Sequence, residues 1–154
     1  MVTYRDGDLL ESKCEVICHQ TNCKGAMGSG IARVIRIFYP EAYEALRRRY
    51  EQGEAKLGVI DLVPTVRGGV MRCVVNCYGE YDYLPRGVVH TDYEALQKCF
   101  NAIAAEFEGS GYTIGFPYKI GCGLAGGDWD IVSKMIENTF EGDKWKVEIW
   151  RLNQ

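Results

Sequence analysis

A glycine-rich segment near the end of the chain has the residue types and spacing of a phosphate-binding turn. Gly121, Gly123 and Gly126 form a G-x-G-x-x-G pattern. A strand-like apolar run over residues 112–116 precedes it, and helical spacing begins at Asp128. Glycines let backbone N–H groups approach an anion closely, and the dipole of a helix N-terminus favours negative charge. The segment therefore predicts an anion site between a strand and a helix.

The position of this pattern argues against a nicotinamide cofactor. The dinucleotide fingerprint lies in the first βαβ unit and is followed, about 20 residues later, by an acidic residue that ends the next strand. Here only one helix and one strand follow the glycines, and Glu148 lies in the middle of that strand. We therefore expect no redox cofactor.

A second glycine-rich turn occurs near the start of the chain. The strand-like residues 15–19 lead into Gly25, Gly28 and Gly30, after which helical spacing begins at Ile31. Two such turns after two strands of one sheet supply enough N–H donors to hold a diphosphate from both sides. The alternative is that these glycines only form tight turns.

The elements that must position these turns alternate between strands and helices. Strands are predicted at 2–5, 15–19, 59–63, 70–77, 112–116 and 146–152, and helices at 31–39, from Pro40, after 91–94 and at 128–140. Thr91 and Glu94 have the spacing of a capping box, and the helix from Pro40 would place Tyr43, Leu46 and Tyr50 inward. The pattern predicts one α/β domain over residues 1–154, with a mixed, largely parallel sheet and ligands beyond the strands' carboxyl ends.

Composition limits the classes of function. The chain has 154 residues, 47% hydrophobic residues and a net charge of −3, so a general electrostatic affinity for nucleic acid is not indicated. Seven cysteines without a C-x-x-C pair, and two histidines, offer little for a metal site. Cysteines within apolar runs fit a reducing compartment. We therefore expect a cytoplasmic monomer with no metal and no membrane segment.

Four segments, in this order along nearly the whole chain, carry a family resemblance: Gly7-Asp8-Leu9-Leu10, Val16-Ile17-Cys18-His19-Gln20-Thr21-Asn22, Gly28-Ser29-Gly30-Ile31-Ala32 and Ile120-Gly121-Cys122-Gly123-Leu124-Ala125-Gly126. The chain resembles a macrodomain, in particular the ADP-ribose 1''-phosphate processing branch, which is related to the terminal ADP-ribose glycohydrolases. The resemblance implies a three-layer α/β/α fold with an ADP-ribose cleft. The expected partners are ADP-ribose, ADP-ribose 1''-phosphate and ADP-ribosylated macromolecules.

The resemblance also implies ligand contacts. Asp8, beside Leu9, would accept a hydrogen bond from the adenine amino group, Asn22 would bind the distal ribose and Trp150 would stack on adenine. Two further groups would hold the diphosphate and distal ribose from opposite sides: Gly28, Ser29, Gly30 and Ile31, and Gly121, Cys122, Gly123, Leu124, Ala125 and Gly126. The residues alone leave three alternatives open: a turn cap for Asp8, an Asx-turn for Asn22 and a core position for Trp150.

Catalysis requires its own residues. The resemblance implies that His19 transfers protons on a phosphate monoester and that Asn22 orients the ribose; His19 is alternatively a core histidine. Asp128 either activates a water or caps the last helix. The terminal glycohydrolases carry a lysine after the central strand and an aspartate where this chain has Ala125. The first hypothesis is therefore hydrolysis of ADP-ribose 1''-phosphate. A non-catalytic ADP-ribose module and removal of ADP-ribose from protein or nucleic acid are the alternatives.

Overall fold

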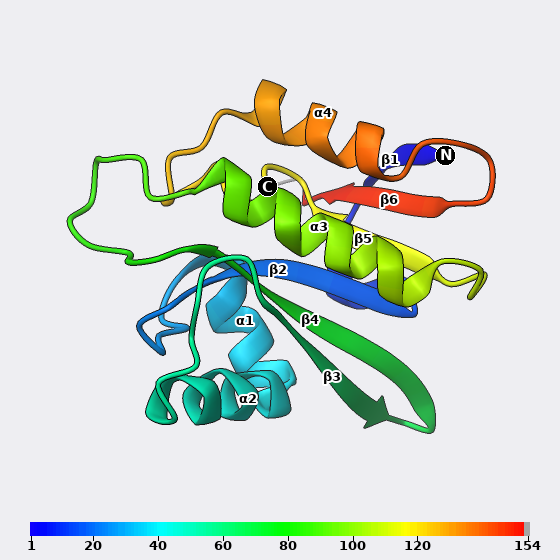
Figure 1. Ribbon diagram of the computed structural model, residues 1–154. Coiled ribbons are helices and arrows are strands. Elements are labelled where there is room, and N and C mark those ends of the chain that lie inside the picture. Colours follow the sequence, from blue (N-terminus) through cyan, green and yellow to red (C-terminus); the bar gives the residue numbers. More distant parts are fainter. Residues whose placement is uncertain (153–154) are drawn as a thin grey trace.

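A six-stranded sheet forms the centre of the structure (Figure 1). The computed structural model describes residues 1–152. Neighbouring strands follow the order β1-β6-β5-β2-β4-β3, and every neighbouring pair is parallel except the β3–β4 hairpin. The prediction of a mixed, largely parallel sheet is therefore confirmed. The strands are β1 (Val2–Asp6), β2 (Val16–Asn22), β3 (Ile60–Arg67), β4 (Val70–Glu80), β5 (Thr113–Pro117) and β6 (Lys146–Arg151).

Helices cover both faces of the sheet and complete the expected three layers. Figure 1 shows one helical pair below the sheet and the other pair above it. The lower pair is α1 (Gly30–Phe38) and α2 (Pro40–Glu51), and the upper pair is α3 (Tyr93–Phe107) and α4 (Trp129–Thr139). A short 3₁₀ helix, η1 (Leu9–Glu11), lies between β1 and β2. The three-layer α/β/α prediction is confirmed.

Two apolar cores lie between the sheet and the two helical layers. Successive side chains of β2 point to opposite faces, so Val16 and Cys18 pack in the core under α3 and α4, whereas Ile17 packs in the core over α1 and α2. All three are fully buried. The central strands are buried on both faces, as is typical of parallel sheets covered by helices. The central strands therefore hold the ends of the neighbouring loops in fixed positions.

Several local predictions were inaccurate. Strands β2 and β3 continue three and four residues beyond their predicted ends, to Asn22 and Arg67. Asp92, rather than Thr91, is the N-cap of α3, because its side chain accepts the Ala95 N–H at 2.9 Å. Strand β4 continues to Glu80, three residues beyond the predicted end, because it pairs with β2 over that length. On α2, Leu46 is buried as expected but Tyr50 is 41% exposed.

Two absences apply to the part of the chain that the structure describes. Within residues 1–152, no helix combines the length and apolar character that crossing a membrane requires. In the same range, no three His, Cys, Asp or Glu side chains are grouped so that they could hold a metal ion.

Candidate functional site

A cleft of about 810 Å³ runs along the edge where four parallel strands end. Trp150 of β6, Pro117 of β5, Asn22 of β2 and Glu80 of β4 all line it. Because these strands are parallel neighbours, their carboxyl ends meet at the same edge. This is where open α/β sheets bind ligands, and the volume lies in the range of small-molecule sites.

Asn22 builds the first glycine loop, which we define as residues 23–30. Its side-chain oxygen accepts the N–H groups of Lys24 at 2.9 Å and Ala26 at 3.3 Å. Its amide group donates to the Ala26 carbonyl at 2.9 Å. Asn22 is 6% exposed and lines the cleft. The Asx-turn alternative is therefore correct for this side chain, which shapes the loop from within the cleft wall.

The first glycine loop presents free N–H groups at the start of a helix. Ser29 is the N-cap of α1, but its side chain makes no capping hydrogen bond. Within residues 1–152, the N–H groups of Gly28, Ser29 and Gly30 have no hydrogen-bond acceptor. All three residues and Ile31 line the cleft. The positive end of the α1 dipole and these donors favour an anion here.

The second glycine loop, defined as residues 119–127, is held in place by its own backbone and by the chain before α3. Gly127 N–H donates to the Gly121 carbonyl at 2.9 Å, and His90 N–H donates to the Ala125 carbonyl at 2.7 Å. The Thr91 hydroxyl also donates to the Gly121 carbonyl. Thr91 is therefore a support for this loop rather than the helix cap that its sequence suggested.

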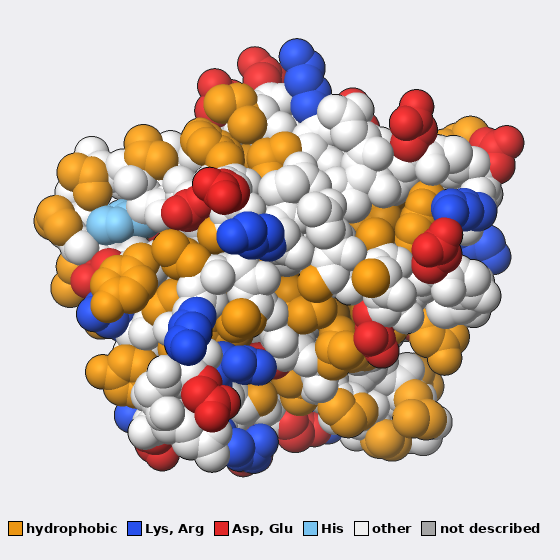
Figure 2. Space-filling model, in the orientation of Figure 1, with side chains coloured by type: hydrophobic (Ala, Val, Ile, Leu, Met, Phe, Trp, Pro, Cys, Tyr) orange, Lys and Arg blue, Asp and Glu red, His pale blue; other side chains and the backbone are white. Residues whose placement is uncertain are grey.

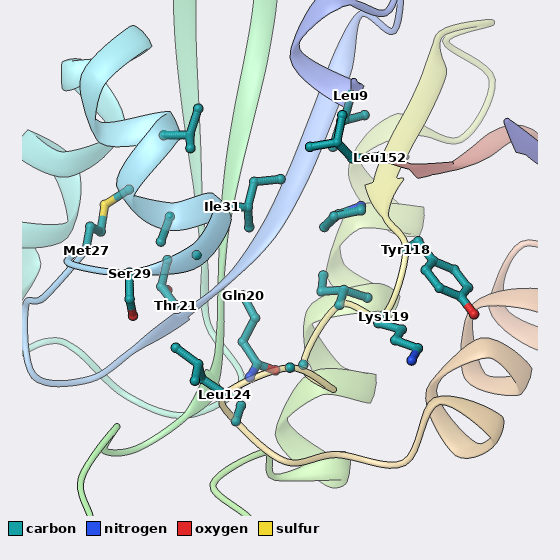
Figure 3. A pocket seen from close by; sticks show the side chains of 18 of the residues that line it. Leu9, Gln20, Thr21, Met27, Ser29, Ile31, Tyr118, Lys119, Leu124 and Leu152 are labelled. Atoms are coloured by element: carbon teal, nitrogen blue, oxygen red, sulfur yellow. The ribbon is translucent and has the colours of Figure 1, made fainter. Parts of the chain in front are cut away.

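This second loop also presents unused donors. Gly123, Leu124 and Ala125 line the cleft, and in the described chain their N–H groups have no acceptor. Lys119, at the start of the loop, has φ +63°, a left-handed conformation that is rare for a residue with a side chain. Figure 3 shows Met27 and Ser29 on one side of the cleft, and Tyr118 and Lys119 on the other.

Gln20 fixes the floor between the two loops. Its amide group donates to the Thr91 hydroxyl at 3.0 Å. The Gln20 side-chain oxygen occupies the space where a Cβ of Gly79 would lie, and a Cβ on Gly121 would come within 2.9 Å of the same oxygen. A side chain at either position would therefore displace the Gln20 amide group, and Gly121 also has a positive φ of +73°. Figure 3 shows Gln20 at the centre of the cleft.

The β6 end of the cleft combines an aromatic ring with a carboxylate. Trp150 lines the cleft and also packs against the core below it. Its stacking on adenine stays a prediction. A Cβ on Gly7 would lie 2.9 Å from the ring. One carboxylate oxygen of Asp8 caps η1 by accepting the Leu10 N–H at 2.9 Å. Leu9 is buried but also lines the cleft, as does Leu152, and both are labelled in Figure 3.

The structure does not bring His19 into the cleft. Its side chain is fully buried and faces the α1–α2 side of the sheet, with Nε2 2.7 Å from the Asn76 side-chain oxygen. Burial lowers the pKa of His19 to about 4, with an opposing contribution from Asn76. A ring in this position cannot contact a bound substrate, so the core alternative describes it and the predicted proton transfer is not assigned to His19.

Asp128 lies outside the cleft lining as well. It is exposed and caps α4, with a side-chain oxygen accepting the Asp130 N–H at 2.9 Å. Its own N–H donates to the Tyr93 hydroxyl at 2.9 Å. The cap alternative therefore accounts for the conformation of Asp128.

Two residues of the second glycine loop, Cys122 and Gly126, do not line the cleft. The Cys122 thiol donates to the Ile120 carbonyl, and burial raises its pKa to about 11, which does not favour a nucleophile. Gly126 packs against the backbone of Val88 and Val89. Cys122 and Gly126 therefore stabilise the conformation of the loop and do not make the cleft contacts predicted for them.

Residues 78–86 are rich in tyrosine, which in the sequence suggests either a flap over the distal end of the cleft or a packed surface loop. Sequence reasoning named no site residue in this connection between β4 and α3. Glu80, Tyr83 and Arg86 all line the cleft. Burial raises the pKa of Glu80 to about 7. The predicted strand ended at Cys77, and extension by three residues would have placed Glu80 at the carboxyl edge. Figure 2 shows apolar side chains gathered around the one visible histidine over this connection.

The fold and the cleft define an α/β/α protein that presents two glycine loops with unused N–H donors at the carboxyl edge of its sheet. The family model described as "Macro domain" matches residues 18–136. The chain belongs to the macro domain family.

Three known proteins illustrate the similarity. The "DNA ADP-ribosyl glycohydrolase" of Mycobacterium tuberculosis is 27% identical over 142 residues, which are 92% of this chain and 39% of that protein. This chain therefore spans about two fifths of the length of that relative. The "ADP-ribose glycohydrolase OARD1" of Homo sapiens is 28% identical over 98% of this chain and 91% of its own. The solved macrodomain of Mycobacterium tuberculosis DarG superposes with a TM-score of 0.83 at 24% identity, covering 97% of both chains.

Proposed function

We propose that this protein binds ADP-ribose in the cleft and hydrolyses the bond that joins the distal ribose to another group. The observation that best supports this proposal is the pair of glycine loops. Each loop presents three N–H groups that have no acceptor in the described chain. A diphosphate carries several oxygen acceptors and two negative charges, which match donors on two opposite walls and the N-terminus of α1.

The strand order gives the proposed ligand a direction. Trp150 and Asp8 lie at the β6 end, where an adenine ring would stack and its amino group would donate to the carboxylate oxygen of Asp8 that does not cap η1. The diphosphate would lie between the glycine loops, at the ends of β5 and β2. The distal ribose would then lie beside Asn22 and Glu80, which are opposite one another in the β2–β4 register.

The group attached to the distal ribose would extend toward the β4–α3 connection. This connection exposes large side chains, among them Tyr81, Leu84 and Val89. Such a surface suits a macromolecular substituent better than a phosphate. Removal of a phosphate was also assigned to His19, which the structure places in the core. The two relatives described above match more than nine tenths of this chain and are both named as glycohydrolases, which supports the same choice. We therefore favour release of ADP-ribose from a protein or nucleic acid over the phosphatase reaction.

One panel tests the proposal. Wild-type protein is incubated with an ADP-ribosylated peptide, an ADP-ribosylated oligonucleotide and ADP-ribose 1''-phosphate, and the release of ADP-ribose is measured by chromatography beside a calorimetric titration with ADP-ribose. Release from the peptide or oligonucleotide supports the proposal. Binding with release only from the 1''-phosphate identifies a phosphatase, and binding without any release identifies a binding module. Absence of ADP-ribose binding refutes the proposal altogether.

A further inference from the structure

Glu80 holds a fixed position at the β4 end of the cleft. It is the last residue of β4 and lies opposite Asn22 of β2 in the register. On its other side it forms an antiparallel bridge with Thr91, the residue whose hydroxyl holds the second glycine loop. The backbone of Glu80 is thus fixed by both neighbouring segments, as positioning of a reacting group requires.

The carboxyl group of Glu80 is not used by the fold. Within residues 1–152 it makes no hydrogen bond and no ion pair. The only other carboxyl group among the described residues that line the cleft is that of Asp8, which caps η1. The same lining contains no histidine and no cysteine. Glu80 is therefore the one cleft carboxyl group without a structural task in this range.

The environment of Glu80 suits proton transfer near neutral pH. Burial is the main cause that raises its pKa to about 7, with the positive influence of His90 lowering it and the Asp82 carboxylate raising it further. From the first glycine loop, the neighbouring titratable group is the Cys23 thiol, whose pKa burial raises to about 11. A carboxyl group poised between its two protonation states can accept and return a proton.

We infer that Glu80 is a catalytic residue that activates the water in the hydrolysis, an inference that rests on the proposed function. The Glu80 carboxylate takes a proton from water while the water oxygen bonds to the anomeric carbon of the distal ribose. The bond from that carbon to the leaving group breaks, and its electron pair stays with the leaving group. The leaving group then gains the proton that Glu80 carries, so the products are ADP-ribose and the protonated leaving group.

The test compares Glu80→Gln, which keeps the shape of the side chain, with Asp82→Asn as a matched control on the same connection. The rate of ADP-ribose release from a modified peptide and oligonucleotide is measured against pH, with ADP-ribose affinity by calorimetry. For Glu80→Gln we expect kcat to fall about 100-fold or more, with affinity within about threefold of wild type. The wild-type rate should rise with pH around an inflection near the Glu80 pKa of about 7, and the variant should lose that inflection.

The control has its own expected result. Asp82→Asn should keep the maximal rate and move the inflection to lower pH, because the Asp82 carboxylate raises the pKa of Glu80. Release by Glu80→Gln at the wild-type rate would overturn the assignment while leaving the proposed function intact. Parallel loss of affinity and rate in a folded variant would overturn it in favour of a binding role. Absence of release by wild type would refute the proposed hydrolysis, and the assignment with it.

Discussion

His19 offers a quantitative test of the distinction between a core histidine and a catalytic one. Asn76 donates its amide group to Asp61 at 3.1 Å and to the Ala42 carbonyl at 2.9 Å, so its side-chain oxygen must accept from His19 Nε2. Nε2 therefore carries the proton, and Nδ1 is an acceptor without a partner in the described chain. His19→Gln places an amide donor where Nε2 lies and removes the titrating group.

The expected effect on stability follows from the depressed pKa. The pKa of His19 falls from the ordinary 6.5 to about 4 in the folded protein, chiefly because the ring is buried. Between these values the unfolded chain binds more protons, so stability is lost as pH falls through this window. From about pH 7.5 to about pH 5, His19 should reduce the free energy of unfolding by about 2 kcal/mol.

Glu80 titrates in the opposite sense, so the prediction is made for a difference between two proteins. Its pKa is raised to about 7 in the folded state, and stability due to this group is therefore lost as pH rises. This contribution is common to wild type and His19→Gln and cancels between them. The difference in unfolding free energy should thus move by about 2 kcal/mol in favour of the variant between about pH 7.5 and about pH 5.

Urea denaturation of both proteins at the two pH values measures this difference. ADP-ribose release by the variant is measured beside it and should be close to the wild-type rate. A difference that does not change with pH would refute the reasoning about burial of the ring. Loss of turnover in a stable His19→Gln variant that still binds ADP-ribose would restore the proton-transfer role and refute the core assignment.

Three further predictions concern the second glycine loop, the cap of α4 and the β6 end of the cleft. Gly121→Ala should lower the free energy of unfolding by about 1–2 kcal/mol, because φ is +73° and the new Cβ would meet Gln20. In Gly123→Ala the new Cβ meets nothing within 4 Å, so the free energy of unfolding should change by less than about 0.5 kcal/mol. Equal losses for the two variants in urea denaturation would contradict this. Asp128→Ala should cost about 1 kcal/mol of stability with turnover unchanged, and Asp128→Ser should restore most of it; slower turnover in the folded variant would instead make Asp128 catalytic. Trp150→Ala should weaken ADP-ribose binding about 5- to 100-fold in calorimetry, through the loss of stacking; an unchanged affinity would place adenine elsewhere.

Much of the fold could be predicted because its apolar runs are short, buried and separated by glycine turns. The helix predicted after residues 91–94 forms as α3, with Phe100 and Ile103 fully buried. On α2, helical spacing predicted an inward Tyr50, but its ring covers the first glycine loop, where a Cβ on Gly25 would lie 2.9 Å from it. Spacing along one helix cannot report a contact with a loop that precedes α1.

The site was predictable where neighbours in sequence determine it. Both glycine loops are local strand–turn–helix patterns, and most of their residues line the cleft. Glu80 was missed because its place depends on pairing with Asn22, a partner 58 positions away in the chain. His19 was misassigned because both neighbours, Cys18 and Gln20, face the other side of the sheet, and a strand buried on both faces does not show which side chains reach its carboxyl edge.

The most direct test of the account is a calorimetric titration of ADP-ribose into the wild-type protein, with AMP and ribose 5-phosphate titrated separately. We expect one-to-one binding of ADP-ribose in the micromolar range and far weaker binding of either fragment, because each fragment leaves one part of the cleft empty. No saturable binding of ADP-ribose, or AMP binding as tight as ADP-ribose, would contradict the claim that the two glycine loops hold the diphosphate.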